Sequence, residues 1–166
     1  MRPEAAQILR TTATTLITQY LPGIEKDHEK TDLGLSALLM MVVSEEFERA
    51  AHRRIEENHA LRRIFAGSLS VIEDKDLRRR VEKASEKTED NYHMSVLDKL
   101  NCELQEILIE LHTHIEAIEG EGARNINEAI WTELENWTKR REFTIWEMAF
   151  AMLTKAATRD EGEIGN

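Results

Sequence analysis

Three acid–histidine pairs have the spacing of ligands in a helical metal site. In each pair the acidic residue precedes the histidine by three positions: Glu25 and His28, Glu56 and His59, Asp90 and His93. Carboxylate-bridged di-iron bundles use this spacing because it places both ligands on one helix face. Acidic residues occupy 32 of 166 positions, so chance accounts for much of the pattern. Two of the pairs also lie in charged, loop-like stretches. We therefore predict no metal and no cofactor.

Two polar residues, Asn101 and His114, interrupt an otherwise apolar helical stripe. A histidine there could ligate a metal, bind a substrate or relay a proton. It could equally be a core histidine whose ring nitrogens meet buried partners, and a buried amide can fix the register of a helix. Glu46 is a further candidate for an inward-facing carboxylate. We favour buried hydrogen bonding and keep, as the alternative, a metal or small ligand bound in the core near His114.

No set of residues predicts covalent catalysis. The chain has no nucleophile elbow, phosphate loop, dinucleotide fingerprint or CxxC pair. The single cysteine, Cys102, faces away from the apolar stripe and cannot form an internal disulfide. We predict no catalytic residue, and an enzyme is the less favoured class.

Arginines gather in three places on the predicted helices. We expect most of them to lie on solvated faces and to pair with nearby glutamates. Arg140 and Arg141 are of more interest for a partner, because they adjoin an aromatic segment. The arginines are Arg53, Arg54, Arg62, Arg63, Arg78, Arg79, Arg80, Arg140 and Arg141.

The stretch 143–153 carries the strongest functional hint. Nine of its eleven residues are apolar, which is more than one helix face can hold. Such a segment is either deeply buried or half of an interface, and a terminal helix is hard to bury on every side of a small bundle. We predict an interface for self-association or for a protein partner. Its predicted residues are Phe143, Ile145, Trp146, Met148, Phe150, Met152 and Leu153.

The organising element is the stretch 93–120. Its leucines and isoleucines recur in three rows with a seven-residue step, the pattern of an amphipathic helix packed into a core. Before it, we expect a helix ending at Pro22–Gly23, a loop, and a second helix capped by Thr31 or Asp32.

The second helix should be central and buried, because it is apolar nearly all round until Val43. We also expect a short helix capped by Asp74, and a last helix beginning at Asn125. With no strand-like alternation, the sequence predicts an all-α antiparallel bundle of four or five long helices.

Length and charge limit the class of protein further. A chain of 166 residues favours one domain, predicted here as 1–158 with a disordered tail at 159–166. The net charge of −10 disfavours contact with nucleic acid or anionic membranes. No signal peptide or membrane span is visible, so we expect a cytoplasmic protein.

The N-terminal part resembles a known family. The opening RPEAAQIL, the Leu21-Pro22 pair and the helix LSALLMMVVSEEFERA are similar to small helical bacterial proteins of the DUF6285 type. Such proteins are encoded beside aminoglycoside-phosphotransferase-like kinases and acyl-CoA dehydrogenases. The resemblance covers residues 1–65 and carries no catalytic residue. It implies an accessory role, assisting a kinase in hydroxyacyl-CoA breakdown. Together these observations predict a non-catalytic interaction protein that forms a homodimer or binds a protein partner through its C-terminal helix.

Overall fold

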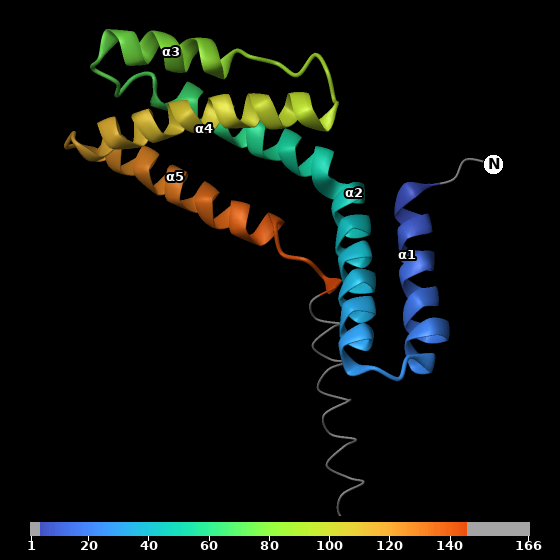
Figure 1. Ribbon diagram of the computed structural model, residues 1–166. Helices are drawn as coiled ribbons and strands as arrows, with labels where there is room; N and C mark the ends of the chain where they lie inside the picture. Colours follow the sequence, from blue (N-terminus) through green and yellow to red (C-terminus); the bar gives the residue numbers. More distant parts are fainter. Residues whose placement is uncertain (1–3, 146–166) are drawn as a thin grey trace, which may run out of the picture. The chain divides into compact units, whose positions relative to one another are not determined.

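The computed structural model describes residues 4–145, and this part of the chain is helical with no strand. The all-α prediction is confirmed (Figure 1). Short π-helical and 3-10 turns, η1 (Leu16–Tyr20) and η2 (Leu21–Gly23), follow the first helix. The five α-helices are α1 (Ala5–Thr15), α2 (Asp27–Ser68), α3 (Lys75–Ser85), α4 (Met94–Glu116) and α5 (Glu121–Arg140). None of these described helices has the length of apolar sequence that a bilayer requires.

Two predicted helix starts are wrong. The second helix, α2, begins at Asp27 rather than at Thr31 or Asp32, so the predicted loop is partly helical. Asp27 and Glu29 lie in its first turn, where the helix dipole stabilises negative charge, and Lys26 pairs with Glu29 at 2.7 Å. These local interactions support a turn that has no apolar period.

The last helix, α5, begins at Glu121 rather than at Asn125. Gly120 precedes it with a φ of 133°, a conformation that side chains of L-residues rarely adopt. This glycine reverses the chain at once, and a Cβ at Gly122 would lie 2.7 Å from Val71 Cγ1. The two glycines therefore allow the helix to start earlier than its polar sequence suggests.

The chain divides into two compact units. Unit 1 comprises residues 1–49 and 142–166, and unit 2 comprises residues 50–141, so α2 contributes to both. The single domain predicted for 1–158 stays a prediction. The tail predicted at 159–166 lies outside the described residues.

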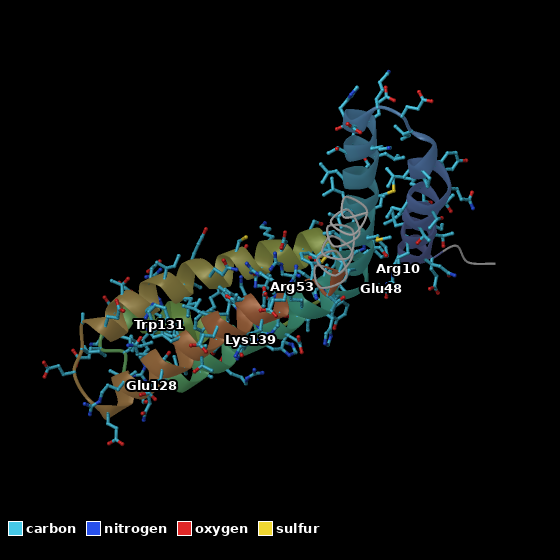
Figure 2. All side chains as sticks on the ribbon, turned by 90° about the horizontal axis from the view of Figure 1, so that it is seen from below. Arg10, Glu48, Arg53, Glu128, Trp131 and Lys139 are labelled. Atoms are coloured by element: carbon cyan, nitrogen blue, oxygen red, sulfur yellow. The ribbon has the colours of Figure 1, made fainter. Side chains whose placement is uncertain are left out.

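Unit 1 is an antiparallel hairpin of α1 and the first part of α2 (Figure 1). Small residues spaced seven apart face each other: Ala6 and Ala13 on α1, Ala37 and Ser44 on α2, all at most 2% exposed. Small side chains allow the two helix backbones to approach closely. The Ser44 hydroxyl fits this seam, because it donates to the Ala6 carbonyl at 2.8 Å and accepts from Arg10 Nε at 2.9 Å. Figure 2 labels Arg10 on α1.

Unit 2 holds the hydrophobic core. The second part of α2 contributes Leu61 and Phe65, which are fully buried against side chains from α3, α4 and α5. The seven-residue row predicted on α4 is confirmed, since Leu97, Leu104 and Leu111 are at most 1% exposed. Asp74 caps α3 as predicted, accepting from the amides of Asp76 and Leu77 at 2.8 and 2.9 Å.

Candidate functional site

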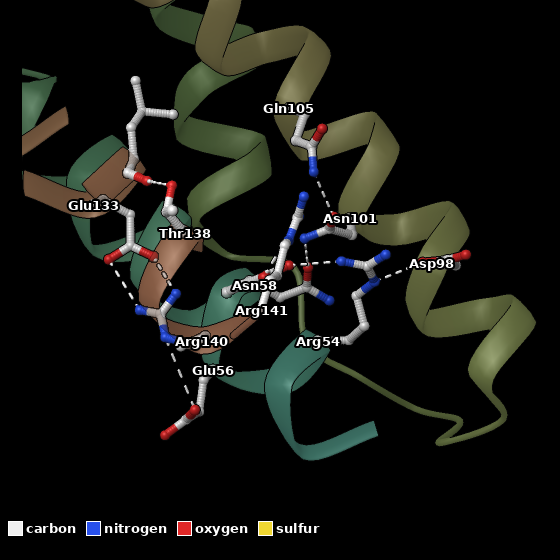
Figure 3. Close-up of polar contacts among 12 residues, drawn as sticks. Arg54, Glu56, Asn58, Asp98, Asn101, Gln105, Glu133, Thr138, Arg140 and Arg141 are labelled. Atoms are coloured by element: carbon white, nitrogen blue, oxygen red, sulfur yellow. Dashed lines mark hydrogen bonds and ion pairs between the residues drawn. The ribbon is translucent and has the colours of Figure 1, made fainter. Parts of the chain in front are cut away.

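Unit 2 contains a cluster of charged side chains, of which Arg54 is largely buried and Asp98 is half-exposed (Figure 3). Glu57 of α2 is fully buried and accepts from Arg54 Nη1 at 2.8 Å, while Arg54 Nε donates to Asp98 of α4 at 2.5 Å. Arg141, just beyond α5, places Nη2 3.6 Å from the other Glu57 oxygen. Burial lowers the pKa of Arg54, but the hydrogen bonds that Arg54 donates to Glu57 and Asp98 outweigh it, and the pKa lies above its usual value. The Arg54 guanidinium is therefore charged at any physiological pH.

A buried row of amides adjoins these charges. Asn101, at 1% exposure, donates from Nδ2 to Asn58 Oδ1 at 2.9 Å and accepts from Gln105 Nε2 at 2.5 Å. The sequence expectation that Asn101 makes buried hydrogen bonds is confirmed. Asn58, its partner, is fully buried on α2. An amide pair of this kind fixes the register of two helices, because a shift of either one would leave polar atoms buried without partners.

The rest of the cluster ties the end of α5 to α2. Arg140 forks onto both oxygens of Glu133 at 2.8 and 3.2 Å, and its Nε lies 3.9 Å from Glu56 (Figure 3). The guanidinium of Arg141 lies 5.7 Å from the centre of the Trp137 ring. Every charged member of the cluster faces an opposite charge, and none of the residues is a hydroxyl, thiol or imidazole nucleophile. The arrangement can hold helices in register.

His114 does not lie in the core. It is half-buried near the end of α4, and its Nε2 accepts from the Glu73 amide at 3.3 Å. The preceding histidine on α4, His112, meets Asn127 at 2.9 Å and lies edge-to-face with Trp131 of α5. The row that contains His114 is only half-buried on α4, so the favoured expectation that His114 is a core histidine is wrong. The alternative, a metal or small ligand bound near His114, stays a prediction.

The predicted acid–histidine pairs do not assemble. His59 lies 3.4 Å from Glu89, on the connection between α3 and α4, rather than beside Glu56. Glu46 lies 3.8 Å from Arg49 on the same helix and is half-buried. Among residues 4–145 no group of three or more histidine, cysteine or acidic side chains has the geometry of a metal site. Cys102 is exposed, as expected.

A second ion pair fastens the connection between α3 and α4. Arg62 Nη2 donates to both oxygens of Glu89 at 2.7 Å, and the Glu89 side chain is only 6% exposed. Burial by itself would raise the pKa of Glu89, but the hydrogen bonds from Arg62 outweigh it, and the pKa lies below the usual range. Sequence reasoning missed this pair, because 27 residues separate its members.

The α2 segment predicted to be buried is largely exposed in unit 1. Leu35, Leu39, Val43 and Phe47 are 54%, 55%, 52% and 63% exposed. They recur at every fourth residue, so they form one continuous row over about three helical turns, about 18 Å long. The prediction was wrong because, within the described residues, α1 covers the face of α2 that carries Ala37 and Ser44, and this row lies outside that face.

The start of the predicted interface segment is attached to α2. The Glu45 carboxylate accepts from the Thr144 amide at 2.9 Å, the Thr144 hydroxyl at 3.1 Å and the Ile145 amide at 3.3 Å. Arg49 lies 4.8 Å from the centre of the half-buried Phe143 ring, and Ile145 is 7% exposed. No spacing or motif in the sequence predicts that Glu45 binds residues 144 and 145. The remaining predicted interface residues lie outside the described residues: Trp146, Met148, Phe150, Met152 and Leu153.

Comparisons with known proteins do not assign the chain to a family. No family model, no curated protein and no solved structure matches the chain. The resemblance of residues 1–65 to proteins encoded beside kinases stays a prediction.

Proposed function

We propose that the chain is a non-catalytic accessory protein that self-associates or binds a protein partner through unit 1. The observation that carries the proposal is the row Leu35, Leu39, Val43 and Phe47, each more than half exposed. Single exposed apolar residues are ordinary, whereas a continuous apolar row marks a contact surface.

The interior of unit 1 supports the same proposal. In its described part the buried residues are Ala6, Ala13, Ala37, Ser44 and Ile145, so Ile145 is the one large side chain that is buried. A helical hairpin with so little buried apolar area gains little hydrophobic free energy. Contact with a further apolar surface would supply it.

Light scattering of the full chain tests the proposal. We expect wild-type protein at the mass of a dimer or higher oligomer, and Leu39→Glu at a lower mass, because a carboxylate in a contact surface must lose its water. Ile109→Glu is the matched control, since Ile109 is 67% exposed on α4 in unit 2. Removal of residues 143–166 should also reduce the number of copies in the oligomer.

A protein partner is the second arm of the same test. The resemblance of the N-terminal part implies a phosphotransferase-like kinase acting in hydroxyacyl-CoA breakdown as the partner to examine first. Such a kinase, co-expressed with the chain, should be retained by wild type and by Ile109→Glu but not by Leu39→Glu. A monomeric wild type that also fails to retain the kinase would contradict the proposal.

A further inference from the structure

The exposed row of unit 1 lies on a stretch of α2 that carries no charge. None of the twelve residues from Leu33 to Ser44 is acidic or basic. The stretch begins after Asp32 and ends before Glu45, and charged side chains are frequent beyond both residues. A charged group brought against this stretch would lose water without gaining a partner. The row therefore fits an uncharged surface, such as another uncharged helix face.

The two ends of the row differ in shape. Phe47 ends it with a ring that is 63% exposed. At the other end Gly34 precedes Leu35, and a Cβ at Gly34 would meet no atom within 4 Å. Glycine weakens a helix interior, because it loses more backbone freedom on folding than other residues do. The row thus has a projecting ring at one end and, at the other, a gap beside Leu35 that no described residue fills.

Acidic side chains lie at the Phe47 end of the row. Glu46 and Glu48 adjoin Phe47 in the sequence, whereas the neighbours of Leu35 are uncharged. If two copies of α2 paired in parallel along this row, each residue would lie level with its own copy. Glu46 and Glu48 would then face identical carboxylates, and like charges at a contact destabilise it. An antiparallel pair avoids this repulsion, because it places the Phe47 end of each copy against the uncharged Leu35 end of the other.

We propose that the row docks on the same row of a second copy, with the two α2 segments antiparallel and related by a two-fold axis midway along the row. Phe47 of each copy then lies beside Leu35 of the other copy and over the gap at Gly34, and Leu39 lies near Val43. Such a contact buries the row in both copies and closes at two copies. The inference rests on the proposed function and specifies its partner and geometry.

The occupant is a second copy because the row is its own complement. A second copy supplies an uncharged helix face of the same length, a ring for the gap at Gly34 and a gap for the ring of Phe47. It also keeps the acidic end of each row away from the acidic end of the other. A different protein would have to provide all these features in the same order.

Cross-linking between copies tests the direction of pairing. Ser36→Cys and Glu48→Cys are made in separate proteins, each with Cys102→Ser, so that every copy carries one thiol and the row stays intact. Ser36 and Glu48 are twelve positions apart, so both lie on the same flank of the row. In the antiparallel pair they are nearly level across the contact, whereas like positions are about 15 Å or more apart along the helix.

A thiol cross-linker that spans about 10 Å, the diameter of a helix, is added to each variant alone and to their equimolar mixture. We expect linked dimers mainly in the mixture, and none when Leu39→Glu is added to both variants. A yield in either variant alone that equals or exceeds the yield in the mixture would overturn the antiparallel contact.

Filling the gap tests the contact at Gly34. Gly34→Leu should raise the dissociation constant of the dimer about tenfold or more, because the added side chain occupies the space of the Phe47 ring. It should not lower the melting temperature of the dilute monomer, since the position is open in one copy and leucine favours a helix. Gly34→Ala, which adds one carbon, is the matched control with a smaller effect. Light scattering across a concentration series measures the constants, and an unchanged value for Gly34→Leu would overturn the contact.

The outcomes separate this inference from the proposed function. A dimer that Leu39→Glu dissociates, but that links as a parallel pair, keeps the proposed function and overturns the antiparallel contact. A monomer that still retains the kinase also keeps the function and rejects the contact. A monomer that retains no kinase rejects both.

Discussion

The two units of this protein pack their helices together with different kinds of side chain. Unit 2 buries leucines, isoleucines and a phenylalanine from α2, α3, α4 and α5. It also contains buried ion pairs and amides. Unit 1 joins two helices through alanines and one serine, and leaves its large apolar side chains on the surface. A single helix, α2, takes part in both. The comparison shows that apolar residues alone do not make a core, because a core needs neighbours on more than one side.

The largest expected difference between the units comes from removing apolar side chains. Phe65→Ala in unit 2 should lower the free energy of unfolding by about 3–5 kcal/mol, since Phe65 is fully buried. Leu39→Ala in unit 1 should change it by no more than about 0.5 kcal/mol, because Leu39 is 55% exposed. Urea titration of monomeric protein at low concentration measures both values. Similar losses in the two variants would mean that the α2 row is part of a core.

A smaller difference is expected from removing carboxylates. Glu57→Ala should cost about 3 kcal/mol, because the largely buried Arg54 then keeps only the half-exposed Asp98 as its partner. Glu46→Ala on the unit 1 part of α2 should cost less than about 1 kcal/mol, since its pair with Arg49 is partly exposed. The same urea titration compares them. A loss for Glu57→Ala no greater than for Glu46→Ala would show that the buried charges of unit 2 contribute little.

The smallest expected effect is on how the melting temperature depends on pH. Glu45 in unit 1 and Glu89 in unit 2 both have lowered pKa values, despite burial, because their hydrogen-bond donors outweigh it. A lowered pKa stabilises the folded state above the unfolded-state pKa, about 4.3 for glutamate, and this contribution is lost as pH falls through the folded-state value. Glu89→Gln and Glu45→Gln should each flatten the fall in melting temperature below about pH 4.3.

Glu86→Gln is the matched control for this pH dependence, since Glu86 lies on the same connection as Glu89 and forms no ion pair with another residue of the range 4–145. It should leave the slope unchanged. A wild-type melting temperature that does not depend on pH in this range would contradict the assignment for both glutamates.

The periodic pattern of apolar residues in the sequence predicts the buried helix faces correctly in unit 2. The seven-residue rows on α4 and the cap at Asp74 were predicted because each depends on residues close together in the chain. Asn101 was expected to be a buried amide because it interrupts an apolar row, and it is one. The starts of α2 and α5 were wrong, since their first turns carry charges and glycines instead of an apolar period.

The tertiary structure decided the contacts that join distant residues. Arg62 pairs with Glu89 across 27 positions, and Glu45 holds Thr144 across 99 positions. No spacing rule connects such residues, because the path of the chain between them sets their distance. The sequence by itself determined the helical class and the amphipathic rows. Only the fold decided which rows are covered, because burial depends on how many helices lie alongside a given face. Among the described residues, the second part of α2 packs against α3, α4 and α5, whereas the row on its first part is exposed.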